Sequence, residues 1–118
     1  MSSNVNRIRA PAPENPHAAL EHEIAQEKAA TLGRLGRRLE AALAALSEFD
    51  TARAGSTGNL TVEDRQIRHA LVADAGVALW HFVVQREALG LRDSARVLRD
   101  YRVPDEVRDR MGVFPARG

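Results

Sequence analysis

The 118-residue sequence contains no cysteine and only five aromatic residues. Without cysteine the chain forms no disulfide, offers no thiolate ligand to zinc or an iron–sulfur cluster, and has no thiol nucleophile. Nothing in it requires an oxidising compartment, so a cytoplasmic location is expected. Charge is also nearly balanced, with 17 basic and 16 acidic residues, and the net charge of +1 gives no overall attraction to nucleic acid or anionic lipid.

Long apolar runs are missing as well. Residues 75–85 form the longest uncharged stretch of the apolar region, which is shorter than the roughly 20 residues needed to span a bilayer. The first fifteen residues contain two arginines but no apolar segment of the kind found in secretory signals. We therefore expect no membrane partner and no secretory signal.

Alanine and arginine are abundant instead. The chain has 20 alanines, and 16 of its 17 basic residues are arginine, with Lys28 as the exception. Most arginines alternate with acidic residues along helical stretches, which is typical of exposed helix faces, and a GC-rich genome favours both residue types. A content of 44% hydrophobic and 28% charged residues indicates a globular domain.

The chain is expected to start with a flexible tail over residues 1–15, followed by a single helical domain over residues 16–118. Asn15 followed by Pro16 is a helix-start signal. The next apolar residues recur at helical spacing and predict a helix over about 16–49. Their positions are Leu20, Ile24, Leu35, Leu39, Ala42, Leu46 and Phe49.

Small residues gather on the opposite face of this helix, at Ala25, Ala29, Gly33 and Gly36. They would let a second helix approach closely, so we regard them as a candidate interface. A second interpretation is that the two glycines mark a kink or a short break, because glycine costs roughly 1 kcal/mol relative to alanine inside a helix. We favour a continuous helix.

A loop is predicted over residues 50–60, and Thr61 is expected to cap the next helix with Asp64 three positions later. Gly90 is suited to the left-handed conformation that ends a helix, with Leu91 supplying the accompanying apolar contact. The inward stripe of this helix consists of Ile67, Leu71, Ala75, Ala78, Leu79, Phe82 and Leu89.

The second long helix is apolar on another side too. Ala73, Val77, Trp80 and Val84 project away from the inward stripe, so this helix is expected to be covered twice. The cover is either the C-terminal segment or a second copy of the chain. The predicted fold is all-α: a long antiparallel two-helix hairpin with two short C-terminal helices packed over it, and a four-helix bundle when two hairpins form a dimer.

The C-terminal segment has the one feature that suggests nucleic-acid binding. Helices are predicted from Asp93 to Tyr101 and from Pro104 to Met111, and residues 93–112 have the spacing of a degenerate helix-turn-helix. Against this, Arg102 lies where the turn usually requires glycine, and the second helix begins with acidic residues that would face phosphates. The alternative is a helical cap packed over Trp80.

No constellation of chemically active residues predicts an enzyme, a metal site or a cofactor. Of the four histidines only His17 has an acid three residues before it, Glu14, which lies in the predicted tail, and no histidine has a second histidine four residues away. Asp74, His81 and Gln85 share one flank of the second helix and suggest a polar seam with the first, but no nucleophile accompanies them. We interpret His81 as a histidine at the edge of the core.

Arg86 lies within the apolar arc of the second helix, so its guanidinium needs a carboxylate or must reach water along its stem. In an antiparallel hairpin the start of the first helix lies near the end of the second. This places Glu21 near Arg86 and predicts a buried ion pair between them, with a water-exposed arginine as the alternative.

Several stretches carry a family resemblance: residues 20–24, 35–43, 82–87 with 90–93, and 99–112. They resemble a family of small uncharacterised alpha-proteobacterial proteins. The resemblance implies a bacterial, cytoplasmic protein and no specific site. The residues themselves favour a non-enzymatic helical protein that acts as a homodimer or through a protein partner, with a nucleic-acid-binding regulator as the alternative.

Overall fold

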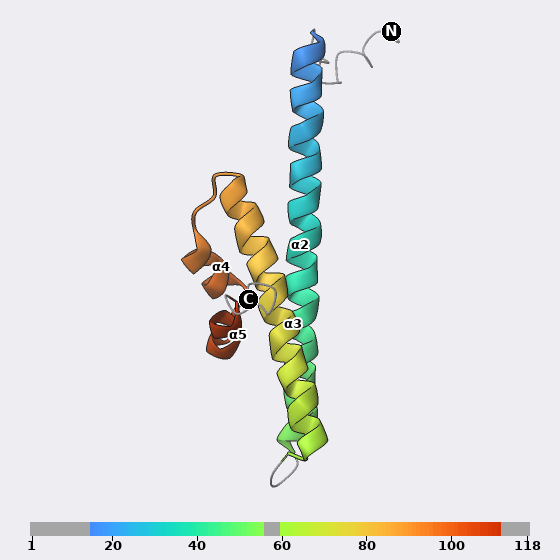
Figure 1. The fold of residues 1–118 in the computed structure, drawn as a ribbon, viewed down its shortest axis with the longest axis vertical. Helices are drawn as coiled ribbons and strands as arrows, with labels where there is room; N and C mark the ends of the chain where they lie inside the picture. The colour runs from blue at the N-terminus through green and yellow to red at the C-terminus, as the bar shows by residue number, and fades with distance from the viewer. Residues whose placement is uncertain (1–14, 56–59, 112–118) are drawn as a thin grey trace, which may run out of the picture. The chain divides into compact units, whose positions relative to one another are not determined.

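The computed structural model of the chain describes residues 15–55 and 60–111. Every regular element in this part of the chain is a helix (Figure 1). The all-α class, with two long and two short helices, is therefore confirmed; the predicted tail lies outside the described residues up to position 14. The helices are α2 (Pro16–Ala54), α3 (Val62–Ala88), α4 (Ser94–Asp100) and α5 (Asp105–Arg110).

The chain divides into two compact units, residues 1–30 and 31–118, where the sequence predicts one domain from residue 16. In the first unit α2 begins as expected, because the Asn15 side-chain oxygen accepts a hydrogen bond from the Ala18 N–H at 2.6 Å. The large apolar side chains of this unit are exposed, Leu20 by 55% and Ile24 by 40%.

Helix α2 continues through Gly33 and Gly36 without a break. It ends at Ala54, beyond the predicted end at residue 49, so the predicted loop is shorter. The extra turn is held by side chains, since Asp50 accepts hydrogen bonds from Arg68 of α3, and Arg53 donates to Asp64 of α3.

Both ends of α3 follow the sequence signals. The Thr61 hydroxyl accepts from the Asp64 N–H at 2.9 Å, which satisfies a first-turn donor. At the other end Gly90 has a φ of +87°, and the Leu91 N–H donates to the Arg86 carbonyl at 2.8 Å. This is the Schellman arrangement, in which a left-handed residue turns the chain and the freed carbonyls regain partners.

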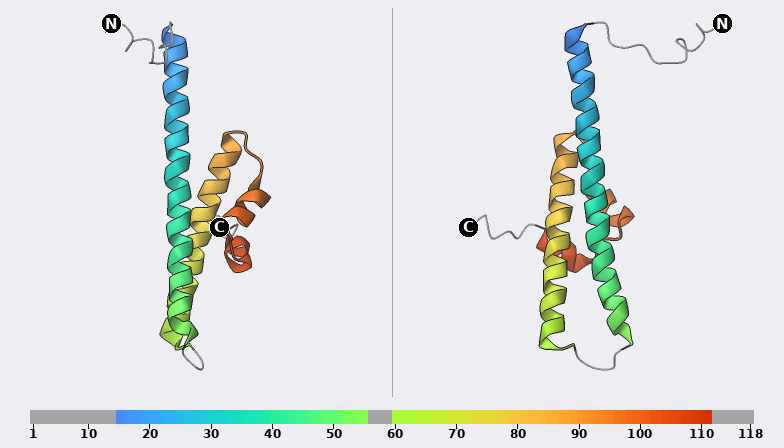
Figure 2. Two further views of the ribbon diagram at one scale, coloured as in Figure 1. Left: turned by 180° about the vertical axis from the view of Figure 1, so that it is seen from behind. Right: turned by 90° about the vertical axis from the view of Figure 1, so that its right-hand side faces the viewer.

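Within the second unit the α4–α5 pair packs beside α3 (Figures 1 and 2) and also reaches the later part of α2, where Tyr101 lies against Gly36. The buried core draws on all four helices, and Leu39, Leu79 and Val107 are its largest fully buried side chains. Burying each of them contributes about 1.5–3 kcal/mol. The remaining buried apolar residues are Ala42, Leu46, Val72, Ala75, Ala78, Phe82, Val83 and Val97.

Two glycines permit close packing between helices. A Cβ on Gly36 would lie 3.2 Å from both a Phe82 ring carbon and the Tyr101 hydroxyl, and one on Gly76 would lie 3.0 Å from the Arg110 Cβ. Gly36 therefore makes room for two packed rings, and Gly76 lets the end of α5 approach the backbone of α3.

The described C-terminal helices contact α3 on the side of Gly76 and Val83. Arg110 of α5 packs on Gly76, and Val97 of α4 lines the same small cleft as Val83. Trp80 is 39% exposed, and a cap over this side chain stays a prediction. In the turn between α4 and α5, Arg102 has a φ of +54°. This is the left-handed conformation that glycine adopts most easily, which agrees with the expectation that the turn usually has glycine at this position.

Among the described helices, α3 alone is long and apolar enough to cross a membrane, with a mean hydropathy of 1.3. A core helix of a water-soluble protein meets the same criteria of length and composition. Much of the apolar side of α3 is buried by the chain itself, as Ala75, Ala78, Leu79 and Phe82 show.

Candidate functional site

Two of the three sides of α3 are covered by the chain. On one side Phe82 lies against Gly36, and Arg68 bonds to Asp50, both in α2. On the second side Gly76 lies against Arg110 of α5, a residue of the C-terminal helices. The helical periodicity of α3 places a third side between these two, which residues 15–55 and 60–111 leave partly exposed, and this side is the candidate site.

The third side carries a regular apolar pattern. Its residues recur at alternating intervals of three and four, the spacing with which helices pack along a common seam. Trp80 and Val84 are 39% and 40% exposed, Ala70 is exposed, and Ala73 and Val77 are half-buried. We call this surface the outer face; it consists of Ala70, Ala73, Val77, Trp80 and Val84.

The predicted interface had a second part, the small residues of α2. Ala25 and Ala29 are exposed and Gly33 is half-buried, whereas Gly36 is buried against Phe82 and Tyr101 of the same chain. The close approach that the glycine permits at position 36 is therefore used inside the protomer. The other residues of the predicted interface, Val77, Trp80 and Val84, lie on the outer face and are partly accessible, and their role as an interface stays a prediction.

The structure pairs Arg86 with Asp93, and the expected contact with Glu21 stays a prediction because Glu21 belongs to the other unit. Arg86 donates to both carboxylate oxygens of Asp93, at 2.8 Å each from its Nη2. Glu21 lies beside His17, with 3.1 Å between the Nε2 and Oε2 atoms. The turn at Gly90 explains the pair with Asp93, because it reverses the chain and returns Asp93 to the last turn of α3.

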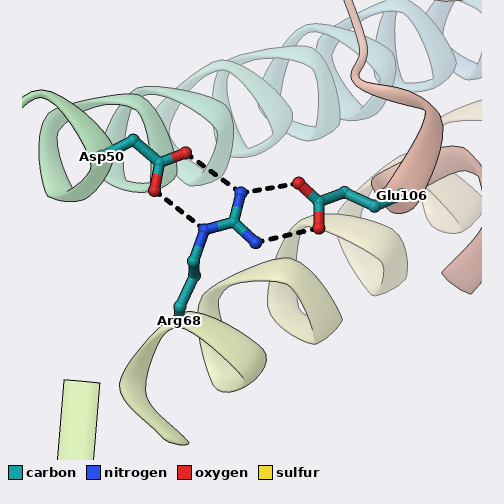
Figure 3. Close-up of polar contacts among 3 residues, drawn as sticks. All are labelled: Asp50, Arg68 and Glu106. Carbon is teal, nitrogen blue, oxygen red and sulfur yellow. Dashed lines mark hydrogen bonds and ion pairs between the residues drawn. The ribbon is translucent and has the colours of Figure 1, made fainter. Parts of the chain in front are cut away.

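Arg68 connects three helices. Its Nε and Nη2 donate to Asp50 of α2 at 2.8 and 3.0 Å, while its Nη1 and Nη2 donate to Glu106 of α5 at 2.9 and 2.6 Å (Figure 3). Such bidentate pairs fix direction as well as distance. The sequence offers a signal for this residue: Arg68 and Arg86 are 18 residues apart, five helical turns, so both lie on the same apolar arc.

These ion pairs shift the acidity of the carboxyl groups. Hydrogen bonds from Arg68 hold the pKa of Asp50 and of Glu106 below their usual values, and burial opposes the shift only in part. The hydrogen bond from Arg86 lowers the pKa of Asp93 in the same way. The charged forms of these carboxylates thus stabilise the fold, and we assign them a structural role.

Polar residues lie along the edge of the outer face next to α2. The His81 Nδ1 is 3.0 Å from the Arg38 Nη1, and the ring of His81 lies 5.4 Å from that of Trp80, centre to centre. A guanidinium can only donate, so Nδ1 accepts and the proton of the neutral ring is on Nε2. Asp74, on the same edge, makes no ion pair or hydrogen bond through its carboxylate with any described residue.

An open groove of about 500 Å³ lies between α3 and α5. Arg110 donates there to His69, at 3.3 Å, and Arg68 and Glu106 at its rim neutralise each other. Within residues 15–55 and 60–111 no cluster of His, Asp and Glu is suited to a metal ion. The groove offers mixed charge without a nucleophile among its lining residues.

The predicted helix-turn-helix elements are in place as α4 and α5. In α5, the second helix of this pair, Glu106 accepts a hydrogen bond from Arg68, and Val107 is completely buried in the core. Nucleic-acid binding by residues 93–112 stays a prediction, and salt-dependent binding of a fluorescent duplex is the measurement that decides it.

Comparison with known proteins gives a family. The whole chain, residues 1–118, matches the model of a family of unknown function, DUF6665. The chain belongs to this family. The expectation of a family without an established role is thereby confirmed, while the alpha-proteobacterial source stays a prediction. No curated protein and no solved structure matches the chain.

Proposed function

We propose that this protein is a non-enzymatic helical module that associates through the outer face of α3. The observation that carries the proposal is the difference between the three sides of that helix. Two sides are covered by α2 and by the C-terminal helices, and the third has an apolar seam with Trp80 and Val84 about 40% exposed. A continuous apolar seam on a helix surface favours a second helix as its cover.

The proposal includes the arrangement that presents this seam. An antiparallel hairpin from Thr31 onward is supported by three contacts between α2 and α3. As the residue number rises along α2 it falls along α3, in the pairs Arg38–His81, Asp50–Arg68 and Arg53–Asp64. The α4–α5 pair braces its other side through Glu106 and Asp93. A rigid α3 would then present the outer face without first having to fold, which lowers the entropic cost of binding.

Sedimentation velocity over the micromolar range tests the proposal. We expect wild-type protein to associate as its concentration rises, and Val77→Glu to stay monomeric because a charge would be buried in the seam. Leu20→Glu is the matched control, since it places the same charge on an exposed apolar residue of α2. A wild-type protein that stays monomeric over the whole concentration range would contradict the proposal. So would an oligomer that Leu20→Glu dissociates and Val77→Glu does not.

A further inference from the structure

We propose that the outer face binds the same face of a second copy of the chain in antiparallel orientation, around a two-fold axis. In this dimer Asp74 of each chain lies against the partner subunit's His81 and Arg38. The inference rests on the proposed function and adds to it the identity of the partner, the direction of its helix and the contacts at the edge of the seam.

Side-chain size favours the antiparallel orientation. In a parallel pair in register, each outer-face residue meets its own copy, so two tryptophans would share one layer and two alanines the next. Such layers need different distances between the helix axes. In the antiparallel register Val77 meets the partner's Trp80 and Ala73 meets the partner's Val84, so each layer joins a larger and a smaller side chain and the layers differ less in size than in the parallel pair.

Charge favours the same register. Asp74 and His81 each follow a seam residue, Ala73 and Trp80, by one position. In a pair of antiparallel helices such residues meet across the seam. Asp74 lacks a polar partner among the described residues, and Arg38 has no carboxylate partner among them. Because Arg38 occupies the His81 Nδ1, the Nε2–H of the ring is left to donate.

Each chain therefore carries both halves of the contact. An unpartnered acid and an arginine–histidine pair lie on the same edge of the outer face, seven positions apart along α3. A two-fold axis between them brings the acid of one chain to the pair of the other and repeats the contact once, as an isologous interface requires. The same chemistry gives an unrelated helix no such reciprocity.

Cysteine cross-linking tests the direction of the helices, and the natural chain has no cysteine to interfere. Under mild oxidation we expect the double variant Ala73→Cys/Val84→Cys to form cross-linked dimers and each single variant to stay uncross-linked. In the antiparallel dimer two copies of residue 84 are roughly 16 Å apart along the axis, 11 residues at 1.5 Å each. A disulfide requires Cα atoms within about 7 Å. Cross-linking of Val84→Cys alone would indicate a parallel dimer and overturn the inference.

A charge exchange tests the contact at the edge. We expect Asp74→Arg and Arg38→Asp each to weaken the dimer roughly tenfold, because each places like charges together twice per dimer. The double exchange should restore most of the affinity. Glu48→Arg, which makes the same charge change at an exposed site of α2, should leave the dissociation constant unchanged.

The outcomes separate the two proposals. If Val77→Glu dissociates the dimer but the charge exchange brings no recovery, the outer face mediates association and the inferred register is wrong. If the wild type is monomeric, or if Val77→Glu leaves its dimer intact, the proposed function fails and the register fails with it. Circular dichroism of each variant shows whether its helices are retained.

Discussion

Arginine at an apolar position of a helix either meets a carboxylate or extends its stem to water. In this chain both arginines on the apolar arc of α3 meet carboxylates, Arg68 at Asp50 and Glu106, and Arg86 at Asp93. The side chains of Arg68 and Arg86 are 27% and 20% exposed, so these pairs are screened less than pairs on an open surface. Each attaches a neighbouring helix to α3.

Replacing Arg68 tests this role. We expect Arg68→Ala to lower the free energy of unfolding by about 1–2 kcal/mol, because two bidentate pairs are lost and two carboxylates are left without a partner. Urea denaturation measures the change. The control is Arg96→Ala, which removes a single pair from a side chain that is 68% exposed and should cost less than about 0.5 kcal/mol. Equal losses in the two variants would show that the three-helix contact adds nothing.

The glycines of α2 provide a matched pair of substitutions. Alanine is favoured over glycine by roughly 1 kcal/mol inside a helix, so Gly33→Ala should stabilise the protein by nearly that amount. Its new Cβ would meet only the end of the Arg37 side chain, at 3.4 Å. Gly36→Ala should gain less or lose stability, because its Cβ would lie 3.2 Å from the packed rings of Phe82 and Tyr101. Thermal denaturation that shows equal gains at both positions would contradict this packing.

At the scale of the element, α5 is too short to be stable alone and depends on its contacts with α3. It has six residues, of which Val107 is fully buried and Glu106 binds Arg68. The pKa of Glu106 is lowered by this hydrogen bond. A carboxyl group with a lower pKa in the folded state stabilises the fold at neutral pH, and this contribution is lost as the pH falls.

We therefore expect the free energy of unfolding of the wild type to decrease as the pH drops below 4.5, the ordinary pKa of Glu. In this range the unfolded chain takes up a proton at Glu106 before the folded chain does. Glu106→Gln should be less stable than the wild type at pH 7, and the gap between them should narrow as the pH falls towards 3. Urea denaturation at a series of pH values measures it. Asp105→Asn, at a neighbouring side chain that is 87% exposed, should follow the wild type throughout. A gap that does not change with pH would exclude an ionic role for Glu106.

The elements themselves could be predicted closely because their signals are local. The cap at Thr61 and the left-handed turn at Gly90 involve residues within a few positions of one another, and both are confirmed. The end of α2 could not be predicted in this way. Its last turn is held by contacts of Asp50 and Arg53 with a helix much later in the chain.

At the scale of the whole molecule, prediction was limited by contacts between distant residues. The excess of apolar surface on α3 was visible in the sequence, but the side that α4 and α5 would cover was not. That choice depends on Gly76, where the missing side chain admits the end of α5, and on Asp93, which the turn at Gly90 brings to Arg86. Trp80 lies on the outer face and is 39% exposed.

The fluorescence of Trp80 on dilution is the most direct test of association through the outer face, because the chain has one tryptophan and it lies within the seam. We predict that its emission maximum shifts to longer wavelength as the protein is diluted, with a midpoint that matches the dissociation constant from sedimentation. Packing against the partner's Val77 would cover the 39% of Trp80 that is exposed in a single chain, and dilution would expose it again. Emission that stays constant while sedimentation shows a dimer dissociating would place the interface elsewhere and contradict the proposal.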